Sequence, residues 1–167
     1  MKVRMIITLL TVIYYMIPIH MIGADPSKDQ HSIEIVSLNK VPIVVFTLNG
    51  KTGYFVLDSG SDVSLVHAPG AVNYHFTFSN RATKSMIGVS GKRQPLYPAA
   101  EVNLHLNQRP LKTDFYATDL SLVVESLIQS TGYAICGIIG MNIMRKYGFE
   151  IDYASRQLVL HLPAQPE

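Results

Sequence analysis

The chain has 167 residues, of which 48% are hydrophobic, and it carries a formal net charge of +2. This composition supplies enough apolar residues for a core and excludes a disordered protein, while the length fits one domain. Outside the first 24 residues, twelve Lys and Arg balance twelve Asp and Glu, so the charge gives no support for nucleic-acid binding.

Residues 1–24 have the layout of a secretory signal peptide. Lys2 and Arg4 form a short basic start, an apolar run follows over residues 5–22, and small residues up to Ala24 suit cleavage. The apolar run is also about long enough to span a bilayer, so an uncleaved anchor helix is the alternative. Both interpretations predict an exported domain that is periplasmic, secreted or membrane-tethered.

The remaining chain divides by composition. Residues 25–31 are polar and are expected to form a linker, a single domain is expected over residues 32–163, and residues 164–167 form a tail.

The first part of this domain predicts a hairpin that ends in an acid. Residues 41–48 form a dense apolar strand, and Asn49-Gly50 is a strong signal for a two-residue hairpin turn. Residues 53–57 return as a strand that leads directly into Asp58, after which Ser59-Gly60 bends the chain. A carboxylate at the end of a strand buried on both faces is costly to ionise, so it calls for a specific role.

The middle of the chain predicts turns, strands and one further hairpin. We expect a turn at Pro69-Gly70, a strand over residues 74–78, and a flexible hairpin over residues 85–93 with Gly88 and Gly91 three residues apart.

The spacing of apolar residues changes from that of a strand to that of a helix in the next part of the chain. Clean alternation predicts strands over residues 101–106 and 114–118. Apolar residues then recur at helical spacing over residues 120–128, with Thr118 or Asp119 available as the N-cap and Gly132 as the end of the helix.

The C-terminal part predicts a buried aliphatic strand, a short helix and a hairpin. The strand covers residues 135–140, and two helical turns over residues 142–147 end at Gly148. Two last strands, 149–153 and 157–162, flank a turn. Eight to ten short strands and two helices make the expected fold class mainly β.

Two segments resemble signatures of one enzyme family. The loop Asp58-Ser59-Gly60-Ser61 after an apolar strand resembles the active-site loop of the retropepsin-like aspartic proteases, and Gly137-Ile138-Ile139-Gly140 resembles the family's second signature. The resemblance covers roughly residues 41–162. It implies a closed acid-protease β-barrel with one or two short helices, preceded by the signal peptide or anchor helix.

The resemblance also assigns roles to residues. Asp58 would be catalytic, Ser59 would hold the loop of a partner subunit, Gly60 would leave room for water, and the Ser61 hydroxyl would donate to the carboxylate. The segment Gly137, Ile138, Ile139 and Gly140 would pack beneath the loop. The hairpin would be the flap that closes over substrate, with its tip formed by Ile87, Gly88, Val89, Ser90 and Gly91.

Hydrolysis of peptide bonds by such enzymes requires two carboxylates that share one proton, because two adjacent like charges do not both ionise. The chain has one Asp-Ser-Gly segment, and Asp114 and Asp152 lack the following Ser-Gly. The second carboxylate is therefore expected from Asp58 of another copy, which makes a homodimer necessary. The expected partners are peptide or protein substrates, with membrane contact only if the leader stays uncleaved. No metal, cofactor or nucleic acid is expected.

Other interpretations stay open. Asp58 alone is also typical of an ordinary turn, and the same barrel without activity would be a peptide-binding or assembly module; a structural envelope protein is a third possibility. The single cysteine, Cys136, lies in an aliphatic strand and is expected to be a small core residue rather than a nucleophile. The six histidines are scattered, without the spacing of a metal site.

Overall fold

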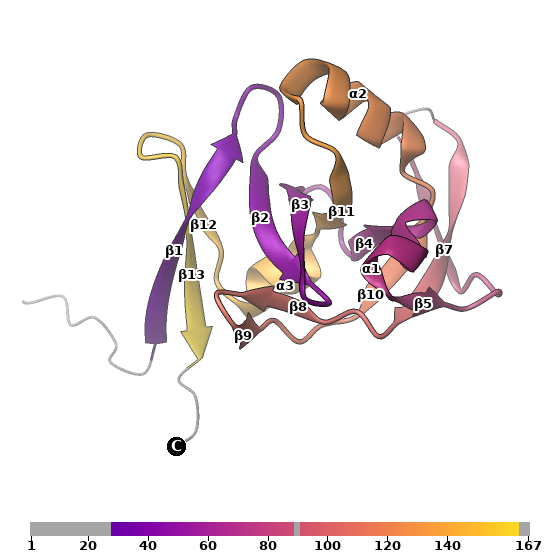
Figure 1. The fold of residues 1–167 in the computed structure, drawn as a ribbon, viewed down its shortest axis with the longest axis horizontal. Helices are drawn as coiled ribbons and strands as arrows, with labels where there is room; N and C mark the ends of the chain where they lie inside the picture. The colour runs from indigo at the N-terminus through magenta and orange to yellow at the C-terminus, as the bar shows by residue number, and fades with distance from the viewer. Residues whose placement is uncertain (1–27, 89–90, 164–167) are drawn as a thin grey trace, which may run out of the picture.

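The structure, a computed structural model, describes residues 28–88 and 91–163. The expected leader over residues 1–24 and the tail over residues 164–167 lie outside the described residues. Within the described part, no helix combines the length and apolar character that crossing a membrane requires. The described chain is mainly β, as expected, and its elements are shown in Figure 1.

The strands form one strongly bent sheet. Their order is β12-β13-β1-β2-β3-β11-β4-β10-β7-β5, with β6 paired to β7 and β8 paired to β2 and β9. The strands are β1 (Lys28–Ser37), β2 (Ile43–Leu48), β3 (Lys51–Leu57), β4 (Ser64–His67), β5 (Thr77–Phe78), β6 (Lys84–Ile87), β7 (Arg93–Ala100), β8 (Leu104–Leu106), β9 (Arg109–Pro110), β10 (Phe115–Thr118), β11 (Ile135–Ile139), β12 (Glu150–Asp152) and β13 (Gln157–Pro163).

The expected closed barrel is wrong. Among the described strands the sheet has two ends, at β12 and at β5, and no pairing joins them. Figure 1 shows β1, β13 and β12 as a ribbon on the left of the molecule, with β5 and β7 on the far right. Because the ends of the sheet lie on opposite sides of the body, the sheet curves around the core without closing.

The helices are short and cover parts of this sheet. The two predicted helices are present as α2 (Ser121–Thr131) and α3 (Met141–Lys146), and α2 ends at Gly132 as expected. Gly132 has φ of +79°, a backbone conformation that glycine adopts without strain. In Figure 1, α2 lies across the top of the molecule, above β11 and β4.

The segment between β4 and β5 differs from the prediction. A 3-10 turn (Ala68–Gly70) leads into the single helical turn α1 (Ala71–Tyr74), where a turn and then a strand were expected. His75 has φ of +54°, which ends the helix and leaves only two residues for β5. Asn49 holds this corner, since its side-chain amide donates to the carbonyls of Tyr74 and His75.

The expected linker also changes. β1 begins at Lys28, so residues 28–31 belong to a strand that pairs antiparallel with β13, with His31 opposite Leu160. The polar composition of this segment therefore does not mark an absence of structure, because its residues pair with β13.

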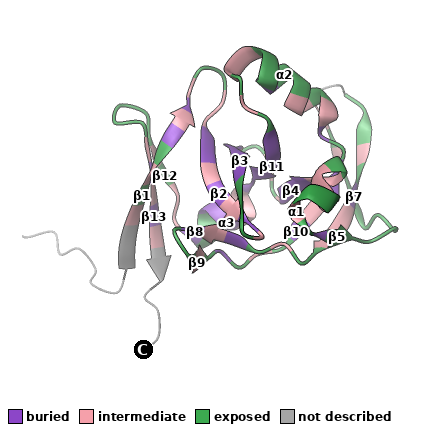
Figure 2. Cartoon of the chain, in the orientation of Figure 1, coloured by how far each residue is buried: buried purple, intermediate pink, exposed green. Residues whose placement is uncertain are grey.

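The core explains the apolar run before Asp58. Phe55 and Leu57 belong to one buried cluster, while Val56 belongs to another that includes Leu65 and Ile138. Since successive side chains of a strand point to opposite faces, β3 is buried on both faces. Figure 2 shows β11, β4 and the end of β3 that leads to Asp58 in the colour of buried residues.

Candidate active site

Asp58 stands where β3 leaves the sheet, beside the end of β11. The two strands are parallel neighbours, with Leu57 opposite Ile139, so their carboxyl ends meet at the same edge. The Asp58 amide donates to the Ile139 carbonyl at 3.0 Å, and the half-buried carboxylate accepts from the Gly60 amide through Oδ1 at 2.9 Å. Backbone contacts therefore orient the carboxylate.

The two serines of the loop differ in their exposure to solvent and in their hydrogen bonds. Ser59 is exposed, whereas Ser61 is half-buried and its hydroxyl donates to the Val63 carbonyl at 2.7 Å. The expected donation from Ser61 to the Asp58 carboxylate is therefore wrong for this chain, because a hydroxyl has one hydrogen to donate. Ser61 stabilises the shape of the loop rather than the charge of Asp58.

The second signature lies directly against the loop. A Cβ on Gly140 would stand 2.7 Å from the Ser61 carbonyl oxygen and 2.6 Å from the Val63 carbonyl carbon, and a Cβ on Gly137 would stand 2.7 Å from the Phe55 ring. These distances leave no room for a side chain. The Met141 amide also donates to the Ser61 carbonyl at 2.8 Å, so the backbone of the second signature is hydrogen-bonded to the Asp58 loop.

The two isoleucines between these glycines pack into different hydrophobic clusters. Ile139 is fully buried in the cluster that contains Leu57, whereas Ile138 belongs to the cluster on the other face and also lines the cleft described below.

A polar network centred on the buried Ser64 lies beneath the loop and was not predicted from the sequence. The fully buried Ser64 hydroxyl accepts from the Gly140 amide at 2.9 Å and donates to Asn142 Oδ1 at 2.7 Å. Asn142 Nδ2 in turn donates to Thr113 Oγ1 and to the Asp114 carbonyl. The signal in the sequence was a lone hydroxyl in the apolar run over residues 63–66.

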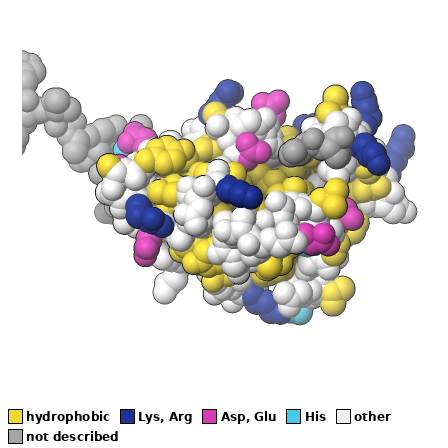
Figure 3. Space-filling view, turned by 90° about the horizontal axis from the view of Figure 1, so that it is seen from above, with side chains coloured by type: hydrophobic (Ala, Val, Ile, Leu, Met, Phe, Trp, Pro, Cys, Tyr) yellow, Lys and Arg dark blue, Asp and Glu magenta, His cyan; other side chains and the backbone are white. Residues whose placement is uncertain are grey.

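Asp58 opens onto a cleft of about 630 Å³. Its floor comes from β3 and β11, one side from the connection between β1 and β2, the other side from the hairpin of β6 and β7, and the roof from α2. Figure 3, which shows the molecule from above, has apolar side chains exposed among polar ones along its middle. The lining residues are Lys40, Val41, Val56, Leu57, Asp58, Met86, Gly88, Gln94, Asp119, Leu120, Leu122, Val123, Ser126, Leu127 and Ile138.

The expected flap is the hairpin of β6 and β7. Ile87 pairs with Arg93, and beyond this pair the Gly88 amide donates to the Lys92 carbonyl and the Gly91 amide to the Gly88 carbonyl. Gly91 has φ of +70°. Met86 and Gly88 line the cleft, whereas Ile87 is 70% exposed. Val89 and Ser90 of the expected tip lie outside the described residues.

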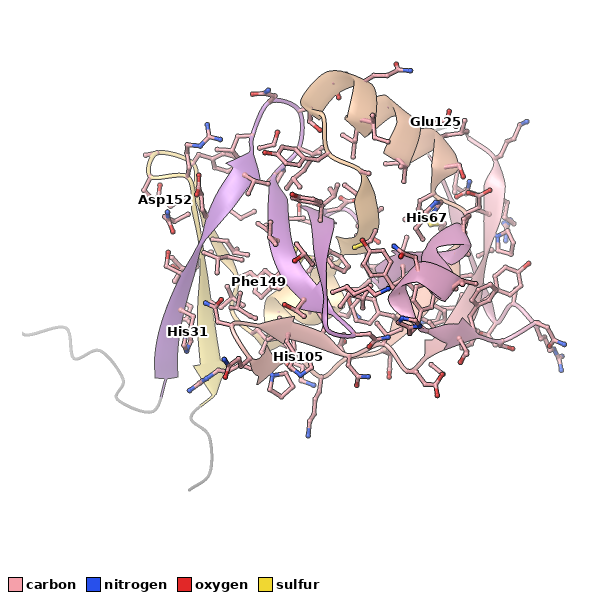
Figure 4. The ribbon with its side chains drawn as sticks, viewed as in Figure 1. His31, His67, His105, Glu125, Phe149 and Asp152 are labelled. Atoms are coloured by element: carbon pink, nitrogen blue, oxygen red, sulfur yellow. The ribbon has the colours of Figure 1, made fainter. Side chains whose placement is uncertain are left out.

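The helix α2 has a role at the cleft that was not predicted from the sequence. Its apolar face, predicted only as a core face, supplies Leu120, Val123 and Leu127 to the roof of the cleft. The residue before the helix is held from below, since the Leu120 amide donates to His67 Nδ1 at 3.1 Å. In Figure 4, His67 lies just under the right-hand end of α2.

The pKa values of two groups at this end of α2, His67 and Asp119, are shifted by their surroundings. Burial lowers the pKa of His67 more than the nearby Asp119 carboxylate raises it. Hydrogen bonds from the Ser121 hydroxyl and amide lower the pKa of Asp119, which keeps that carboxylate ionised.

Cys136 is buried, as expected, and its thiol donates to the Tyr54 carbonyl at 3.3 Å. Burial raises its pKa to about 12, so it stays a neutral thiol. In the described part of the chain, no group of three or more His, Cys, Asp or Glu side chains is placed to hold a metal ion.

The sequence matches no protein-family model, and no curated protein matches it. Solved structures do match. A retropepsin-like aspartic protease from Rickettsia conorii superposes with a TM-score of 0.52 at 16% identity, over 84% of this chain and 97% of that one. The chain is also similar to EIAV protease complexed with the inhibitor HBY-793 (TM-score 0.48, 18% identity, 65% of this chain and 89% of that one). A third match is the retroviral protease-like domain of Ddi1 from Leishmania major (TM-score 0.46, 18% identity, 76% and 95%).

The likeness to the Rickettsia structure shows the fold: this chain has the fold of a retropepsin-like aspartic protease.

Proposed function

We propose that the protein is an aspartic endopeptidase that acts as a homodimer, with Asp58 of each subunit in one catalytic pair. The observation that carries this proposal is the position of Asp58, which lies on a backbone-held loop at the floor of a cleft of about 630 Å³. The shared fold supports the same reaction class.

The reaction follows from the chemistry of paired carboxylates. Asp58 and the partner's Asp58 share one proton, since both do not ionise at close range. The ionised member accepts a proton from a water molecule as that water attacks the scissile carbonyl carbon, and the protonated member donates to the carbonyl oxygen. The two carboxyl groups titrate as one pair, so activity requires a pH at which the pair holds one proton.

The cleft indicates the shape and chemistry of the substrate. Most of its lining is aliphatic, from Val41 on one side to Leu127 in the roof, with strand edges and the β6–β7 hairpin beside it. An extended polypeptide would hydrogen-bond to these backbone groups and place alternate side chains in the cleft. We therefore expect cleavage within unstructured segments next to bulky apolar residues.

Exchange of Asp58 tests this proposal. The wild-type protein is expected to cleave an unstructured protein such as casein at mildly acidic pH, and Asp58→Asn is expected to lose this activity because a neutral amide accepts no proton from water. Asp114→Asn is the matched control, since Asp114 is exposed and lies outside the cleft lining. It should retain full activity.

Mixing tests the pairing. If equal amounts of wild type and Asp58→Asn exchange subunits, about one quarter of the dimers keep both carboxylates, so activity per total protein falls to about one quarter. A fall only to one half would show that each wild-type subunit acts by itself. Wild-type protein that binds but never cleaves peptide would instead identify a binding module.

We further propose that residues 1–24 direct export and that the domain acts outside the cytoplasm. N-terminal sequencing of the mature protein from its native host tests this, and a chain that still begins at Met1 in the cytoplasmic fraction would contradict it.

A further inference from the structure

The entry of α2 is tied to the strands on which the site is built. β4 and β10 are parallel neighbours, and His67 at the end of β4 pairs with Thr118 at the end of β10. The Thr118 hydroxyl donates to the Pro95 carbonyl on β7, and His67 Nδ1 accepts from the Leu120 amide. The segment that leads from β10 into α2 is therefore joined to β4 through Leu120 and to the hairpin strand β7 through Thr118.

This junction satisfies backbone groups that the helix itself leaves unpaired. The first amides of a helix have no partner within it, and Leu120, the N-cap residue, makes no side-chain cap. Asp119 Oδ1 accepts from the Ser121 amide at 2.9 Å, and His67 accepts from the Leu120 amide. Leu120 is 3% exposed and lines the cleft, so a shift of this amide also moves the roof of the cleft.

We propose that His67 is a positioning residue for the substrate cleft: through the Leu120 amide it holds the α2 roof in the place that accepts a bulky apolar side chain of the substrate. This inference rests on the proposed function for the identity of the ligand, but the contact itself does not involve Asp58.

The contact requires the neutral imidazole. Because Nδ1 accepts a backbone amide, the ring proton must lie on Nε2, and a second proton on Nδ1 would abolish the acceptor. The charged group that acts on His67 is the Asp119 carboxylate. It raises the pKa of the imidazole, whereas burial of the ring lowers this pKa by more. Protonation also places a positive charge at the positive end of the helix dipole, which disfavours the helix start. Acid is therefore expected to loosen the roof of the cleft.

The test is peptide binding in an Asp58→Asn background, where cleavage does not interfere. The probe is a fluorescein-labelled decapeptide with Leu-Phe at its centre, and its partner probe has Ala-Ala there. Fluorescence anisotropy gives Kd from pH 4.5 to 8 for His67, His67→Ala and His67→Asn. Asn offers an amide oxygen near the position of Nδ1 and does not titrate, so it serves as the conservative variant.

At pH 8 the Leu-Phe probe should bind His67→Ala roughly three- to tenfold more weakly than the parent, as expected for one lost hydrogen bond, while His67→Asn binds as the parent does. As the pH falls, the parent alone should lose affinity to the level of the alanine variant. The Ala-Ala probe should respond little to either change. In the active background the same pattern should appear in KM, with kcat at pH 8 unchanged.

The proposal is overturned if all three proteins show the same Kd and the same pH dependence. It is also overturned if Asn is as weak as Ala, which would assign His67 a role in packing only. Should His67→Ala fail to fold, the comparison of His67→Asn with the parent across pH still decides. A wild-type protein that binds with this pH dependence yet cleaves nothing would remove the protease proposal and leave the role of His67 standing.

Discussion

Single polar atoms decide the geometry around Asp58. The Ser64 hydroxyl joins the two signatures, because it accepts from Gly140 on one side and donates to Asn142 on the other. Both partners lie within three residues of Ile139, the residue whose carbonyl receives the Asp58 amide. Ser64 is fully buried, so water does not replace this hydroxyl if it is removed.

Ser64→Ala should therefore destabilise the protein. The buried Gly140 amide and Asn142 Oδ1 would each lose a partner, and an unsatisfied buried polar group costs about 1–3 kcal/mol. Urea denaturation followed by circular dichroism measures the free energy of unfolding. Ser126→Ala on α2 is the control, because that side chain is exposed and should change stability by less than about 0.5 kcal/mol. Equal stability of the two variants would contradict the structural role of Ser64.

Among the elements, the β6–β7 hairpin and α2 enclose the cleft from two directions. Both expose apolar side chains that the isolated chain leaves uncovered, including Ile87 on the hairpin and Leu122 on the helix, each 70% exposed. Large exposed apolar side chains beside a cleft are typical of surfaces that become covered when a ligand binds. We expect Ile87 to be covered when the hairpin meets bound peptide.

Ile87→Asp should therefore weaken peptide binding without changing stability. The aspartate would carry a desolvation cost only in the complex, so KM should rise roughly tenfold while Tm stays within about 1 °C of wild type. Val72→Asp is the matched control, because Val72 is 88% exposed on α1 and lines no part of the cleft. If both variants change KM alike, the hairpin has no special part in binding.

At the scale of the whole molecule, the two ends of the described chain support one another. β1 runs antiparallel to β13, and residues 31 and 33 lie opposite Leu160 and Leu158, which are fully buried. β1 then continues to β2, where Ile35 pairs with Val44. The strand after the expected leader is therefore part of the domain, and a cleavage site near Ala24 would leave it intact.

Removal of this strand should weaken the fold. A chain that begins at Ile35 would uncover β13 and should lose roughly 2–5 kcal/mol relative to a chain that begins at residue 25, since it loses the half-buried Ile33 and the cover over two buried leucines. Thermal unfolding of the two proteins at equal concentration measures the difference. An unchanged melting temperature would show that residues 25–34 are a linker after all.

The sequence was informative wherever structure depends on neighbours in the chain. The Asn49-Gly50 turn, the period of α2 and its end at Gly132 were predicted correctly, because turn chemistry and helical spacing act over a few residues. The family resemblance of the Asp58 loop and of Gly137 to Gly140 likewise predicted the fold, and the superposition confirms it.

Only the tertiary structure decided how these parts meet. An apolar stripe indicates that one face of a helix is covered, but it does not indicate which other element covers that face. The placement of α2 over the cleft could therefore not be predicted from the sequence. The hydrogen-bond partners of Ser64 are brought together only by folding, since Gly140 and Asn142 lie 76 and 78 residues away from it in the chain. Whether the sheet closes into a barrel depends on the distance between its two edge strands in the folded protein. Local sequence patterns carry no information on this distance.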